Sequence, residues 1–242
     1  MKALIDYINE GILGSTDDIL QQGDDEVARE HIIAQLTNPN LYYINRHTQF
    51  DKVFNIYKKR GKWIVDVNGF ITCFCTEDGY ITDGTYEFGT VSGPFSVTNN
   101  DDMCEDKCRC KSLQYGPTMC KSDWTIENCP DLKDLKHCPK MVHGTASVTN
   151  TGIETIKYFP TYCEVAQFIG NDNLTTLKGA KRCTVARQIY FMSNGADITT
   201  DMIRNMPWQC NGDSNNRIYR IHNAIIGDDS DIAKNYKLLN KR

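Results

Sequence analysis

Four cysteines in one short stretch are the residues best suited to metal chemistry. Cys104, Cys108 and Cys110 lie close together, and Cys120 follows them. Four thiolates can hold a tetrahedral zinc ion, which would also order the loop that carries them. The spacing lacks the usual C-x2-C pair, and Cys110 occupies an apolar position of a repeat described below, which favours packing in the core. We expect no resident metal or other cofactor, with zinc at these four thiols as the alternative.

The other titratable residues form no recognisable catalytic pattern. The sequence contains no G-x-S-x-G, P-loop, HExxH or glycine-rich dinucleotide motif. Its five histidines are far apart in the chain, and the acidic run at 101–106 is typical of a solvated loop. We therefore expect no catalytic or cofactor-binding residues, and we expect that the protein is not an enzyme.

The eleven cysteines indicate a reducing compartment. An odd number of cysteines, without a secretory signal at the start of the chain, is not typical of a disulfide scaffold. Reduced cysteine behaves as a small apolar residue and is among the most buried types. We expect free thiols in the repeats, at Cys129, Cys138, Cys163 and Cys183.

The composition excludes several classes of protein. The chain has 242 residues, of which 40% are hydrophobic and 24% are charged, a balance typical of globular domains. Its formal net charge of −4 argues against a generally basic surface, so nucleic acid is not an expected partner. No window approaches 18 apolar residues, so no membrane span is expected.

A repeat of 21 residues indicates which elements carry these side chains. Segments 122–142, 143–163 and 164–184 align without gaps, and each contains two aliphatic residues three positions apart. A unit this short cannot bury its own core and must stack on its neighbours. The aliphatic pairs are Leu132 and Leu135, Ile153 and Ile156, and Leu174 and Leu177.

The repeat predicts a β-rich, right-handed solenoid of about five to six coils. Each coil adds one strand to a parallel sheet, the aliphatic pairs form the core, and Asn150 and Asn171 satisfy backbone groups at the bend after the strand. We expect four parts along the chain. They are an N-terminal helical docking segment (1–48), a strand-rich opening cap (49–92), the solenoid (93–204), and a C-terminal cap with a tail (205–242).

The N-terminal segment lies outside the repeat. Leu4, Ile5, Ile8 and Ile12 have helical spacing and form the apolar side of an expected docking helix. A second helix is expected over 26–38.

Two motifs connect the repeat to a known group of proteins. One is a strand followed by NDNLTTLKGA (171–180), and the other is the run FGTVSGPF (88–95) after a strand pair around an Asn-Gly turn. Both are similar to short leucine-rich-repeat proteins of tailed phages that infect gut Bacteroidetes (crAss-like and related phages). The resemblance covers about 63–200 and implies a leucine-rich solenoid that binds other proteins.

The N-terminus carries a second resemblance. MKALIDYINE followed by Gly11 resembles the capsid-targeting leader of internal head proteins in large tailed phages. That resemblance implies cleavage by a prohead protease between Glu10 and Gly11. The segment 11–27 resembles the opening of virion-associated proteins from the same phages. The alternative is a plain terminal helix that caps the first coil.

Together these features predict a non-catalytic phage protein, either a structural component or packaged cargo of the virion. Its expected partners are head, portal or tail components or a host protein, and it would form oligomers only through the symmetry of the particle. It would reside in the virion, and in the host cytoplasm before assembly. One alternative is a host-directed interaction module that is absent from the particle, and another is a bacterial leucine-rich effector from an integrated element.

Overall fold

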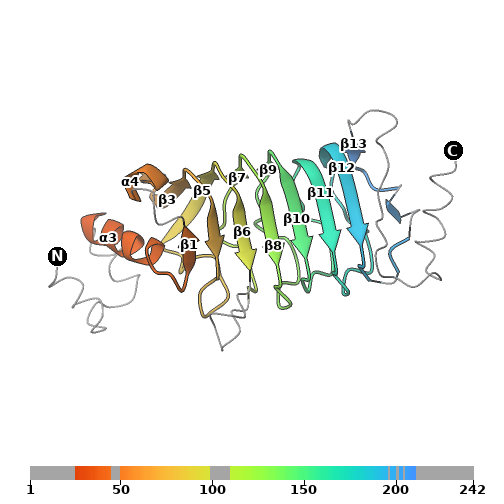
Figure 1. Ribbon diagram of the computed structural model, residues 1–242, viewed down its shortest axis with the longest axis horizontal. Helices are drawn as coiled ribbons and strands as arrows, with labels where there is room; N and C mark the ends of the chain where they lie inside the picture. Colours follow the sequence, from red (N-terminus) through yellow and green to blue (C-terminus); the bar gives the residue numbers. More distant parts are fainter. Residues whose placement is uncertain are drawn as a thin grey trace.

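The computed structural model describes residues 25–44, 50–98, 110–195, 197–199, 202–203 and 205–210. They form a β-solenoid of about five turns, with the strands lying across its long axis (Figure 1). None of the described helices is long and apolar enough to cross a membrane. The docking helix residues Leu4, Ile5, Ile8 and Ile12, and the cleavage pair Glu10 and Gly11, lie outside the described residues.

Most turns contribute two strands, rather than the single strand expected from the repeat. The first strands are β3 (Lys62–Val67), β5 (Tyr86–Val91), β7 (Met119–Cys120) and β9 (Met141–Val142). The second strands are β4 (Ile71–Cys73), β6 (Phe95–Thr98), β8 (Trp124–Glu127) and β10 (Thr145–Thr149). We call the two resulting rows of parallel strands the first and the second ladder.

The two ladders merge toward the C-terminal end. The long strands β11 (Tyr162–Ile169) and β12 (Thr184–Met192) belong to both, because β11 pairs with β9 through Tyr162 and with β10 through its second half. β13 (Gln209–Cys210) continues only the first ladder, on β12. The parallel pairing begins at β3 and β5, inside the segment expected as the opening cap.

Antiparallel strands occupy the N-terminal end of both ladders. β1 (Tyr42–Ile44) pairs antiparallel with β4, and β2 (Phe54–Lys59) pairs antiparallel with β3. Helix α3 (Asp25–Leu36) lies at the same end, where it buries Ala28, Ile32 and Leu36, and the short helix α4 (Phe50–Val53) precedes β2 (Figure 1). These elements cover the sheet edges that the first turn would otherwise expose.

The bend after the second ladder repeats one backbone conformation. Asn128, Asn150, Gly170 and Ser193 have φ angles of 55°, 50°, 64° and 50° at successive turns. This left-handed region suits glycine and asparagine, which explains three of the four residue types. Gly170 also has no room for a larger residue, because an added Cβ would lie 2.2 Å from Oδ1 of Asn150.

Asparagine amides link these bends along the solenoid axis. Oδ1 of the fully buried Asn171 accepts a hydrogen bond from the Thr151 backbone N–H at 3.0 Å. Its Nδ2 donates to the Val148 carbonyl and to Oδ1 of Asn194, both at 2.9 Å. Asn150 donates similarly to Asn128, at 3.2 Å. The expected bonding of backbone groups at the bend is thus present at Asn171, whereas the Asn150 amide bonds the side chain of Asn128 instead.

The core consists of inward columns of stacked side chains. In the first ladder, Val and Cys alternate from turn to turn, in the order Val91, Cys120, Val142, Cys163 and Val185. On the third side of each turn, which has no strand, the aliphatic pairs point inward. Leu132, Leu135, Ile153, Ile156, Leu174 and Leu177 are all buried there, with exposures between 0 and 5%.

Candidate binding face

The broad outward face of the second ladder is the continuous surface best suited to binding. Its strands run in register from β4 to β12, so each outward position forms a column across the turns. The central column contains Thr72, Ser96, Thr125, Ser147, Gln167 and Tyr190. The next contains Thr98, Glu127, Thr149, Ile169 and Met192. We call these two columns the outer face.

The outer face changes in chemistry along the axis. Over β4, β6, β8 and β10 the central column is formed only by threonine and serine, of which Ser147 on β10 is buried at 7% exposure. Over β11 and β12 the same two columns present larger side chains, and Ile169, Tyr190 and Met192 are each half-buried. Neighbouring strands are about 4.8 Å apart, so the hydroxyl-rich and apolar halves adjoin within one continuous sheet.

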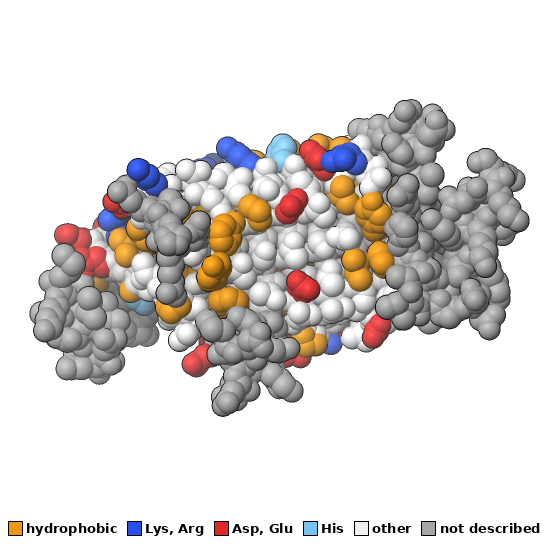
Figure 2. Space-filling view, viewed as in Figure 1, with side chains coloured by type: hydrophobic (Ala, Val, Ile, Leu, Met, Phe, Trp, Pro, Cys, Tyr) orange, Lys and Arg blue, Asp and Glu red, His pale blue; other side chains and the backbone are white. Residues whose placement is uncertain are grey.

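Few charged side chains interrupt this face. Figure 2 views it directly, and most of the surface over β6, β8 and β10 is uncharged, with apolar side chains gathered toward the two ends. Glu127 is the charged residue of the two columns, and Glu164 and Arg187 form an ion pair of 3.6 Å at the margin. The central part of a protein interface is likewise poor in charged residues.

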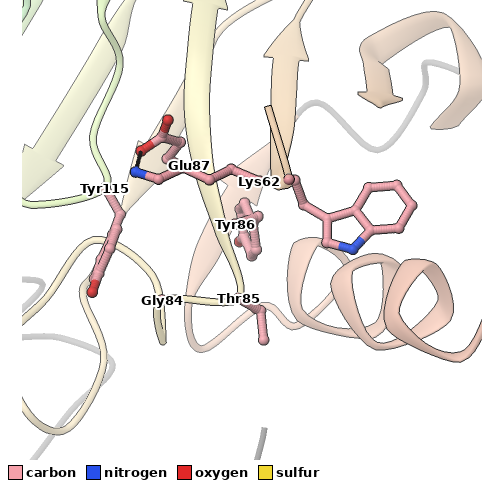
Figure 3. Close-up of a pocket in the computed structure, with 8 residues that line it drawn as sticks. Lys62, Gly84, Thr85, Tyr86, Glu87 and Tyr115 are labelled. Carbon is pink, nitrogen blue, oxygen red and sulfur yellow. Dashed lines mark hydrogen bonds and ion pairs between the residues drawn. The ribbon is translucent and has the colours of Figure 1, made fainter. Parts of the chain in front are cut away.

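A small pocket lies on the first ladder near the N-terminal end. Lys62 and Glu87 form an ion pair of 3.3 Å across its upper side, and Tyr115 lies below this pair and beside Gly84 (Figure 3). Gly84 has a φ of 93°, which favours glycine, and an added Cβ would also lie 3.2 Å from the Tyr115 ring. Its volume of about 130 Å³ is well below the size typical of ligand sites.

None of the cysteines whose side chains the structure describes forms a disulfide, and they include Cys129, Cys138, Cys163 and Cys183. Burial raises the pKa of Cys120 to about 12, so this thiol stays protonated and unreactive. For Cys110, hydrogen bonds with Cys129 and Cys75 outweigh burial and hold the pKa well below its usual range. Cys110 itself is buried, at 2% exposure.

The proposed zinc ligands divide between described and undescribed parts of the chain. Cys110 and Cys120 lie in the core, whereas Cys104 and Cys108 lie outside the described residues. Within the described ranges, no group of three or more His, Cys, Asp or Glu side chains is arranged to hold a metal ion.

The repeat identified the core but not the outer face. The residues of the outer face alternate with buried ones, as Gln167 does between Ala166 and Phe168. That period of two, read together with the period of 21, was the signal that could have located both columns in the sequence.

Comparison of the chain with protein-family models, curated proteins and solved structures finds no match. The side chains of the outer face, and the motifs of the sequence, are therefore the basis for a functional proposal.

Proposed function

We propose that the chain is a non-catalytic binding protein of a tailed phage, and that its outer face contacts another protein of the virion. The observation that carries the binding role is the in-register outer face, which runs without a break from β4 to β12. A sheet held rigid by stacked turns presents its side chains with little loss of conformational entropy on binding.

The apolar half of the outer face supports this role most strongly. Ile169, Tyr190 and Met192 are half-buried large side chains on neighbouring strands, and tyrosine and methionine are enriched in protein interfaces. Threonine and serine on the preceding turns supply hydroxyl groups that can exchange hydrogen bonds with a partner. We infer that the apolar half contributes most of the affinity and the hydroxyl-rich half contributes orientation.

The assignment to a phage rests on the two sequence resemblances. The repeat and the run 88–95 resemble leucine-rich proteins of these phages, and residues 1–27 resemble virion-associated and capsid-targeted ones. The leucine-rich character is supported by the six buried aliphatic residues on the third side of the turns. The alternative is a host-directed interaction module that uses the same face but is absent from the particle.

Mass spectrometry of purified particles tests the virion assignment. We expect peptides of this chain at a constant ratio to the major capsid protein through successive density gradients. An N-terminal peptide beginning at Gly11 would identify leader cleavage. Absence of the chain from particles, combined with its detection in infected cells, would overturn the virion role and support the host-directed module.

Photocrosslinking tests the face itself. Gln167 or Tyr190 is replaced by benzoylphenylalanine in the full chain, and particles are irradiated after assembly. We expect crosslinks to one particle protein from both positions. The matched control is Asn55 on β2, which is exposed and lies far from the outer face. Equal crosslinking from Asn55 would contradict a specific role for the outer face.

A further inference from the structure

The third side of the solenoid carries a row of lysines that the proposed function does not use. In three successive turns, a side-chain oxygen accepts a hydrogen bond from the backbone N–H two residues later, and that later residue is a lysine. The pairs are Asp134 with Lys136 at 2.8 Å, Thr155 with Lys157 at 3.2 Å, and Thr176 with Lys178 at 3.1 Å. We call Lys136, Lys157 and Lys178 the lysine row.

The recurrence of one local turn places the lysine row on equivalent positions. The turns are also joined directly on this side, because the Glu154 backbone N–H donates to the Lys133 carbonyl at 3.0 Å. Adjacent turns of a parallel β-solenoid are separated by about 4.8 Å, so the backbone positions of the three lysines span about 10 Å along the axis.

These cations have no anionic partner in the described part of the chain. All three are exposed, and the ion pairs among described residues involve other lysines, at positions 58 and 62. A fourth cation, Lys181, adds to the row: its Nζ lies 5.4 Å from the centre of the Tyr158 ring, and Nζ of Lys157 lies 5.3 Å from the same ring. Two ammonium groups from neighbouring turns thus converge on one aromatic side chain.

The three equivalent positions of the row all carry lysine, whereas the chain as a whole has a net charge of −4 and the carboxylates of these turns, such as Asp134 and Glu154, stand at other positions. Like charges facing each other on neighbouring strands or turns are destabilising. An anion bound across the row relieves that repulsion, and the stacked turns fix the backbone positions from which the lysines reach it.

We propose that the lysine row, with Lys181, binds a short acidic segment of a partner protein. Lysine presents a compact point charge that pairs with a single carboxylate without the planar alignment that arginine requires. The row is short, and a long polyanion such as nucleic acid would extend from it over a surface that is negative on balance. A short acidic peptide needs to contact only the row.

The test measures fluorescence anisotropy of a labelled deca-glutamate peptide with the full chain, at about 50 and 300 mM salt. The test variant carries Lys136→Gln, Lys157→Gln and Lys178→Gln. The matched control carries Lys52→Gln, Lys59→Gln and Lys111→Gln, three exposed lysines elsewhere with the same change in charge. Circular dichroism melts confirm that both triple variants remain folded.

We expect the test variant to bind the peptide about 10-fold more weakly, the control to stay within about 2-fold of the native chain, and high salt to weaken native binding. Equal losses in the two variants, or no native binding at low salt, would overturn the proposal. A single-stranded oligonucleotide of equal charge that binds more tightly, with the same dependence on the row, would replace the acidic segment by nucleic acid. None of these outcomes bears on the outer face, which is a separate surface.

Discussion

The two ends of the solenoid core are both aromatic, but their rings are arranged differently. At the N-terminal end the ring of Phe88 makes edge-to-face contacts with three other rings. They belong to Tyr42, Tyr86 and Phe95, and the interplanar angles lie between 68° and 83°. At the C-terminal end Phe168 stacks on Phe191 at 11°, and Phe159 stacks on Trp208 at 16°. The turns between them bury mainly aliphatic side chains.

The two ring arrangements differ because the strands that carry the rings pair differently. Phe168 and Phe191 occupy the same register position of parallel strands, which sets identical side chains one above the other. The N-terminal rings come partly from the antiparallel strand β1, and two of them are tyrosines with buried hydrogen bonds. One end is therefore closed by packing alone, and the other by packing combined with specific polar contacts.

The largest expected effect tests the stacked end. Phe168→Ala should lower the free energy of unfolding by about 3–5 kcal/mol, because the ring is fully buried against Phe159, Phe191 and Trp208. Phe168→Leu, which keeps most of the volume, should cost clearly less. Urea unfolding followed by circular dichroism measures both. A cost below about 1 kcal/mol for Phe168→Ala would mean that stacking does not hold this end.

The next effect tests the aliphatic turns. Leu174→Ala should cost about 2–5 kcal/mol, since the side chain is fully buried on the third side of its turn. Leu132→Ala, at the equivalent place two turns earlier, is the matched variant and should cost a similar amount. Similar values would show that the turns are energetically equivalent between the two ends. A large difference would show that stability is concentrated at one end.

The stacking of turns was predictable from the sequence, because the aliphatic pairs recur at a fixed period. Leu132, Ile153 and Leu174 each stand at the same place in a turn, and a 21-residue unit has no other way to bury them. The two strands per turn were not predictable from that period. β7 and β9 are only two residues long, too short to show an alternating pattern.

The aromatic ends were also beyond sequence reasoning, because their contacts join distant segments. Tyr42 and Tyr86 are hydrogen-bonded but lie 44 residues apart in the sequence. Phe159 and Trp208 are stacked, and their separation in the sequence is similar. No repeat relates these residues. The outer face and the lysine row, by contrast, follow from the repeat once the strand register is known.

A pH-dependent effect tests the polar end. Asp83 holds helix α3 to the solenoid: His31 Nε2 lies 3.0 Å from its Oδ2, Gln35 donates to the same oxygen, and the Thr85 backbone N–H donates to Oδ1 at 2.9 Å. Burial raises the pKa of Asp83, but the hydrogen bonds from His31, Thr85 and Gln35 outweigh it and lower the pKa to about 2.

Because this pKa lies below the unfolded value of about 3.9, the stabilisation is complete above about pH 4 and disappears as the pH falls toward 2. Because Asp83 is partly exposed and solvent screens its contacts, the stabilisation is at most about 2 kcal/mol. Asp83→Asn should therefore be less stable than the native chain at pH 6, and the two should converge near pH 2. Urea midpoints across this range measure the difference. A constant difference at all pH values would contradict a role for the Asp83 charge.

The smallest expected effect concerns the tyrosine hydroxyls that distinguish the N-terminal end. Tyr86 donates to the Tyr42 hydroxyl at 2.8 Å, and Tyr42 donates to the Ile81 carbonyl at 2.6 Å. Tyr86→Phe removes one hydrogen bond and leaves the second in place, so it should cost about 1 kcal/mol. Tyr42→Phe should cost more, because it leaves the Tyr86 hydroxyl and the Ile81 carbonyl buried without their partner.

The double variant should cost less than the sum of the two, since the shared hydrogen bond is lost only once. Strictly additive costs in urea unfolding would show that the two hydroxyls act independently, and that the N-terminal end is held by ring packing in the same way as the C-terminal end.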